Sequence, residues 1–178
     1  MSCNSKSQED SLKFDIDYNS LGEKYSSDSL NLTFFLPAGW NIDKSKPLPG
    51  QTQKFPGTEL DSYSLKIKEI FYDSLSSSFC SVSKIQANDS LKIKSLLNSY
   101  ETIFTRQFGS ENVKRGHFSI GEMEINQFLL MTNTYVLFKL NFMTDKNFIL
   151  QLDYAIDRSI YPGYIKKIES SIGSIATL

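Results

Sequence analysis

The sequence predicts an α+β fold, a largely antiparallel β-sheet with helices packed on its faces in an α/β/α sandwich. Apolar and polar residues alternate in several segments, as in half-buried strands, whereas apolar residues recur at helical spacing in mid-chain and near the C-terminus. In the strongest pair of strand segments one face is apolar and the other is partly apolar. Such a sheet is expected to be covered on both faces.

The N-terminal part is predicted to contain one clear strand. Residues 14–18 alternate apolar and acidic side chains, which favours a short edge strand, and residues 20–29 are expected to form a loop. Residues 31–36 form an apolar strand. It is followed by the longest irregular segment, 37–57, which holds four of the five prolines. Long structured loops are where function is often found.

Two further strands are predicted before the first helix. Residues 60–72 and 79–87 both alternate apolar with polar side chains, and the segment 73–78 joins them as a turn. Cys80 lies in the apolar alternation of the second strand, where it is expected to be a small buried hydrophobic residue.

The first helix is expected to follow directly. Residues 88–90, Asn-Asp-Ser, supply capping side chains, and apolar residues continue at helical spacing as far as Phe108. Gly109 is the expected helix stop.

The second half of the chain predicts more strands and a closing helix. Residues 118–125 and 128–131 have strand character, with a turn or bulge at Gly121, and residues 135–143 and 148–156 form a strong hairpin. The last helix begins near Tyr161 with Pro162 in its first turn. Its buried stripe is expected to consist of isoleucines: Ile165, Ile168, Ile172 and Ile175.

Composition limits the classes of function. The 178 residues suffice for one domain, here expected at 12–178 after a flexible tether at 1–11. Nineteen basic residues face twenty acidic ones without a basic run, so no nucleic-acid partner is expected. No apolar stretch reaches the roughly 18 residues that a membrane-spanning helix needs.

The sequence carries no recognisable catalytic motif. His117 is the only histidine and is expected at the surface, and no Gly-x-Ser-x-Gly elbow, phosphate loop or dinucleotide motif occurs. Asp15 and Asp17, and likewise Glu122 and Glu124, could bind a cation, but solvated strand faces often carry such pairs. We therefore predict no enzyme activity, catalytic residue, metal or cofactor.

The stretch LTFFLPAGWN at 32–41 has an architectural explanation. Pro37 cannot donate a ladder hydrogen bond and ends the strand, Gly39 permits the turn, and Trp40 can fold back over the core with its N–H partnered at the rim. In the alternative interpretation, Trp40 stacks on a ligand or contacts a partner.

The same corner suggests a family. Phe34, Pro37, Gly39 and Trp40, together with YIKKIESSIGSI at 164–175, resemble the PsbP-like fold. That fold is shared by the photosystem II extrinsic subunit, the Mog-type Ran-binding factors and the bacterial DcrB-like lipoproteins. The resemblance implies the predicted α+β sandwich and protein partners, but the binding residues of the family cannot be assigned here beyond the corner.

The N-terminus resembles a mature bacterial lipoprotein. Cys3 precedes a polar segment, Asn-Ser-Lys-Ser, and would be the lipid-attachment residue after removal of a signal peptide. Cys3 and Cys80 form no CxxC or metal-binding pair. The lipoprotein interpretation places the protein in the cell envelope, held at the membrane by a lipid anchor only. The alternative is a cytoplasmic protein whose third residue happens to be cysteine.

Two hypotheses of function follow. The first is a non-enzymatic, membrane-tethered accessory module that binds a protein partner through segment 37–57 or a sheet edge. The second is a carrier of a small apolar ligand in a phenylalanine-lined cavity between sheet and helices. A pocket of several hundred Å³ would favour the carrier, and a closed core with an exposed apolar patch would favour the module. The sequence does not define an oligomeric state.

Overall fold

The computed structural model describes residues 14–42, 52–54, 63–87, 93–144 and 148–178. Ten strands are present in these residues: β1 (Leu21–Ser27), β2 (Leu32–Pro37), β3 (Trp40–Ile42), β4 (Thr52–Lys54), β5 (Tyr63–Asp73), β6 (Phe79–Ala87), β7 (Val113–Ile120), β8 (Met123–Met131), β9 (Tyr135–Met143) and β10 (Ile149–Asp157). The α-helices are α1 (Ile93–Phe108) and α2 (Tyr161–Gly173), and two short 3-10 helices are η1 (Tyr18–Ser20) and η2 (Ser110–Asn112).

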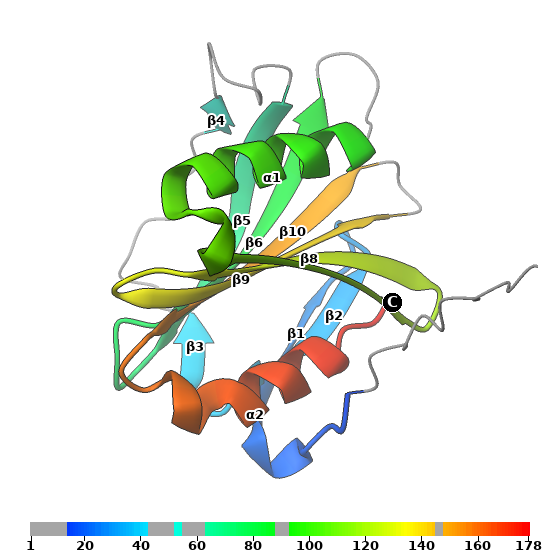
Figure 1. Ribbon diagram of the computed structural model, residues 1–178. Helices are drawn as coiled ribbons and strands as arrows, with labels where there is room; N and C mark the ends of the chain where they lie inside the picture. The colour runs from blue at the N-terminus through cyan, green and yellow to red at the C-terminus, as the bar shows by residue number, and fades with distance from the viewer. Residues whose placement is uncertain (1–13, 43–51, 55–62, 88–92, 145–147) are drawn as a thin grey trace, which may run out of the picture.

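The structure is the predicted α+β sandwich. Its middle layer is an eight-stranded antiparallel sheet in the order β3-β5-β6-β10-β9-β8-β7, with β4 also paired to β5. Helix α1 covers one face of this sheet, and α2 with the β1–β2 hairpin covers the other (Figure 1). Both faces are covered, as the partly apolar second face predicted.

The central hairpin pairs without irregularity. Strands β9 and β10 stay in register from the pair Met143 and Ile149 to the pair Tyr135 and Asp157. Because side chains alternate along each strand, one set points to α2 and the other to α1. The strong alternation in the sequence therefore predicted this hairpin correctly.

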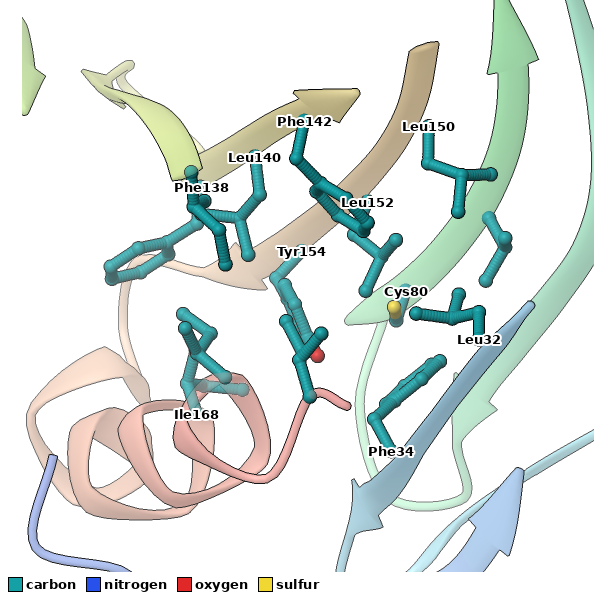
Figure 2. Packing of buried hydrophobic residues seen from close by; sticks show 14 of the residues in the cluster. Leu32, Phe34, Cys80, Phe138, Leu140, Phe142, Leu150, Leu152, Tyr154 and Ile168 are labelled. Atoms are coloured by element: carbon teal, nitrogen blue, oxygen red, sulfur yellow. The ribbon is translucent and has the colours of Figure 1, made fainter. Parts of the chain in front are cut away.

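The larger core lies between the sheet and α2. Side chains from β2, β6, β9, β10 and α2 meet there (Figure 2). Cys80 is completely buried among them, and burial raises the pKa of its thiol well above the usual value. The thiol is therefore a packing group without thiolate character. A second cluster lies between the sheet and α1 and includes Leu96, Tyr100 and Phe128.

Ser171 in the last turn of α2 and Ser174 at its C-cap complete the free edge of β2. Ser171 Oγ donates to the Phe35 carbonyl at 2.6 Å, and Ser174 Oγ accepts from the Phe35 amide at 2.9 Å. Just beyond the helix, Thr33 and Ala176 exchange two backbone hydrogen bonds of 2.9 Å. The SSIGSI segment thus satisfies backbone groups that an edge strand would otherwise leave unpaired.

The isoleucine stripe of α2 is shorter than predicted. Ile168, Ile172 and Ile175 are buried, but Ile165 is 38% exposed. Tyr161 and Tyr164 pack against the core at the first turns of the helix, so Ile165 is not needed there. Helix α1 ends before Gly109, as predicted.

Two N-terminal predictions were wrong. Residues 14–17 form no strand; Asp17 instead caps η1, accepting a hydrogen bond from the Asn19 amide at 3.1 Å. The expected loop at 20–29 contains β1, whose Tyr25 ring lies 5.4 Å from Phe34. A mainly polar segment forms this strand because β2 pairs with it from Lys24 to Ser27 and again at Leu21.

Two boundaries also differ from the predictions. Strand β7 begins at Val113 rather than at residue 118, so His117 lies inside the strand. The segment 37–57 contains β3 and β4, and its other residues beyond Ile42 lie outside the described part of the chain. Among the described residues, none of the helices has the length and apolar character that crossing a bilayer requires.

Candidate functional site

The LPAGW corner is closed over the larger core. Gly39 has φ +90°, a conformation that favours glycine, and this turn brings Trp40 into β3 opposite Asp73. The Trp40 side chain is 2% exposed, and its ring centroid lies 6.3 Å from that of Tyr154. The burial of Trp40 matches the interpretation in which its side chain folds back over the core. The predicted rim partner for the indole N–H was wrong, because Nε1 has no hydrogen-bond partner in the described part of the chain.

His117 forms a surface cluster on β7. Its Nε2 lies 2.8 Å from Glu124 Oε2, and the two side chains are 52% and 61% exposed. Ser119 Oγ donates to Glu124 Oε1 at 2.8 Å. The carboxylate therefore lies between the hydroxyl and the imidazole, whereas a hydrolase triad needs the imidazole beside the serine. This arrangement gives the imidazole no route to activate Ser119.

The two acidic pairs noted in the sequence were not predicted to bind a metal, and the structure shows where their members lie. Asp17 caps η1, and Glu122 lies in the turn between β7 and β8 while Glu124 lies on β8. In the described ranges no group of three or more His, Cys, Asp or Glu side chains could hold a metal ion.

A groove of about 790 Å³ lies at one end of the sheet, and we call it the sheet-end groove. It lies where the β7–β8 turn, the end of β9, the start of α1 and the segment after α2 approach one another. The residues lining it come from these elements and from the end of the β1–β2 connection: Asn31, Ile93, Ile120, Gly121, Glu122, Met123, Glu124, Asn126, Phe142, Met143, Thr144, Ile175, Ala176 and Thr177.

Local structure explains the shape of the groove. Ile120 and Met123 are paired across β7 and β8, so only Gly121 and Glu122 form the turn. Gly121 has φ +58°, the left-handed conformation that such tight hairpin turns require. On the other wall, the hydrogen bonds between Thr33 and Ala176 hold the C-terminal segment beside β2. The groove therefore has two anchored walls.

A row of polar side chains runs across the sheet beneath α1. Strand register places Asn126, Asn141, Gln151 and Ser83 side by side on β8, β9, β10 and β6. Tyr100 donates its hydroxyl hydrogen to Gln151 Oε1 at 2.6 Å, and burial raises the pKa of this tyrosine, which keeps it a neutral donor.

One member of this row has no hydrogen bond. Asn141 is completely buried, and neither its amide nitrogen nor its oxygen has a partner in the described part of the chain. The next residue of the row, Asn126, lines the sheet-end groove. A buried amide without a partner is costly, so it marks a position where water or another group would be stabilising.

The groove could not be identified from the sequence, since its residues come from five separate parts of the chain. Cys3, the predicted lipid-attachment residue, lies outside the described residues. Its role remains a prediction, as does the binding role of Trp40.

Comparison with known proteins identifies the fold. No family model matches the sequence, and no curated protein matches it. The solution structure of cyanobacterial PsbP (CyanoP) from Synechocystis sp. PCC 6803 is similar, with a TM-score of 0.52 and 10% sequence identity. The match covers 89% of this chain and 94% of that one. A crystal structure from Bacteroides thetaiotaomicron VPI-5482 matches with a TM-score of 0.40 and 13% identity, covering 89% of this chain and 49% of that one.

The chain therefore has a PsbP-like fold, an α+β sandwich with a large antiparallel sheet, as the LPAGW corner and the closing helix indicated.

Proposed function

We propose that this protein is a non-enzymatic accessory module that binds a protein partner through the sheet-end groove. The observation that carries this proposal is an open groove with many apolar lining residues on a molecule whose sheet faces are otherwise filled by packed side chains. Met143 is one of these lining residues and is 37% exposed. A partly exposed apolar groove with polar residues at its rim is typical of an interaction site.

The alternative function is a carrier of a small apolar ligand. The volume of the groove, about 790 Å³, would suit such a ligand. However, the groove lies at the end of the sheet rather than between the sheet and the helices. The latter space, where the carrier hypothesis expected its cavity, contains the two packed clusters. An extended partner segment fits this open position better than an enclosed ligand does.

We also propose that the module is tethered to a bacterial membrane through a lipid on Cys3, in the cell envelope. This part of the proposal is supported by the sequence alone, in which Cys3 is followed by a polar segment. A lipid anchor would keep the groove near partners at the same membrane. A single acyl chain gives only marginal membrane binding, so stable anchoring would need several chains.

The test compares two variants with the same added side chain. Met143→Arg places a bulky charged group in the groove, and Leu75→Arg places one in the β5–β6 turn at the opposite end of the sheet, where Leu75 is 87% exposed. Both positions are accessible, so neither change should unfold the protein. Each purified protein would be used to capture partners from detergent-solubilised envelope of the native organism.

We expect one partner to be retained by the wild type and by Leu75→Arg but lost with Met143→Arg. Equal retention by all three proteins would contradict the proposal. Recovery of a small apolar molecule from the native protein, lost in Met143→Arg, would support the carrier instead.

A further inference from the structure

We infer that the sheet-end groove recognises a polypeptide segment in which Lys or Arg residues stand next to apolar residues. This inference rests on the proposed function and adds the chemistry of the partner. Three features of the groove carry it: the apolar side chains that line it, the charge of its rim and a polar side chain that also lines it.

Several residues that line the groove have apolar and adaptable side chains. Met123 and Met143 are among them, together with Phe142 and Ile120. Methionine side chains are flexible and polarisable, so they can fit apolar side chains of different shapes. This favours a partner that presents leucine-like or aromatic residues rather than a single rigid ligand.

The rim carries charge of one sign. Among the described residues that line the groove, Glu122 and Glu124 are the charged ones, and none of these described residues is Lys or Arg. Glu124 is held by His117 and Ser119. Glu122 lies in the tight turn, is exposed, and makes no ion pair within the described residues. It is therefore available to a cation from a partner.

The negative charge of the rim favours cationic partners over anionic ones. A cationic side chain beside the apolar lining residues would meet a complementary carboxylate, whereas an acidic segment or an anionic lipid head group would be repelled. Asn126 adds a side-chain amide on the α1 side of the groove, which can donate to and accept from the backbone of a bound segment. These features together favour a basic, apolar peptide.

The test uses two synthetic peptides of equal length, one alternating Leu with Lys and one alternating Leu with Glu, each flanked by Gly and Ser. Binding to the whole isotope-labelled chain would be followed by NMR through the backbone amide signals. We expect the Lys peptide to bind about tenfold more tightly than the Glu peptide. The shifted amides should include Gly121, Met123 and Met143.

Two charge reversals provide the variant and its control. Glu122→Lys changes the rim, and Glu23→Lys makes the same change on the exposed side of β1, away from the groove. Glu122→Lys should abolish or reverse the preference for the Lys peptide, and Glu23→Lys should leave it unchanged.

Equal binding of both peptides, binding of neither, or shifts confined to other surfaces would overturn this inference. If Met143→Arg still releases a native partner in the capture experiment, the protein-binding function stands and only the charge preference is wrong. If the capture experiment also shows no effect of Met143→Arg, the proposed function fails with it.

Discussion

Replacement of Trp40 by alanine tests whether the LPAGW corner closes the core. The side chain is 2% exposed and packs in the larger cluster beside Tyr154. Truncation of a fully buried tryptophan costs about 3–5 kcal/mol. The indole N–H has no partner among the described residues, and an unsatisfied buried donor itself costs about 1–3 kcal/mol. Removing this N–H partly offsets the cost of the cavity. We therefore expect the free energy of unfolding to fall by about 3 kcal/mol, near the lower end of the range for truncation.

Trp40→Phe separates these two effects. It keeps an aromatic ring in the core and removes the unpartnered N–H, so the expected loss is below about 1.5 kcal/mol. Urea unfolding followed by circular dichroism gives the free energy of unfolding of both variants. In the wild type, Trp40 is the only tryptophan, so its emission should be blue-shifted, poorly quenched by iodide, and red-shifted cooperatively on unfolding.

An alanine variant whose unfolding free energy stays within about 0.5 kcal/mol of the wild type would show that Trp40 does not close the core. A red, readily quenched emission from the native protein would refute it independently. Trp40 would then be an accessible side chain, and the ligand-stacking interpretation would be the better one.

Three other predictions concern single residues. Mass spectrometry of the native protein should show a lipid adduct on Cys3, and a native chain that begins at Met1 and is extracted without detergent would contradict this. His117→Ala should change the unfolding free energy by less than about 1 kcal/mol, because its ion pair is exposed; loss of a hydrolytic or metal-dependent activity would show that the residue has a catalytic role. Asn141→Leu should stabilise the protein by about 1 kcal/mol, because it removes two buried polar atoms that have no partner in the described ranges. Destabilisation would instead show that an internal water or a ligand satisfies this amide.

Elements with strong periodicity could be predicted from the sequence. The β9–β10 hairpin and both α-helices were predicted because their apolar residues repeat at the period of the structure they form. The tight turn at Gly121 was also indicated, since glycine readily adopts the left-handed conformation.

Elements stabilised by their neighbours could not be predicted in this way. Strand β1 has little apolar alternation and depends on pairing with β2. In β5, an irregularity between Ile67 and Glu69 changes the direction of the side chains, so Leu65 faces α1 but Phe71 faces α2. Simple alternation could not show this change.

The candidate site was not predictable because the fold assembles it. Glu122, Met143 and Ala176 are far apart in the sequence and meet only when the strand ends and the C-terminal segment are in place. The row of polar side chains beneath α1 could not be predicted from the sequence for a related reason. Asn141 and Gln151 look like outward-facing strand residues until α1 covers them.

Site-specific cross-linking in living cells tests the central claim most directly. A photo-reactive amino acid would replace Met143 in the groove, and in a control strain it would replace Leu75 at the other end of the sheet. We predict that illumination gives a defined adduct with one protein from position 143 and none with that protein from position 75. The same adduct from both positions, or no protein adduct from position 143, would contradict the assignment of the groove as the partner-binding site.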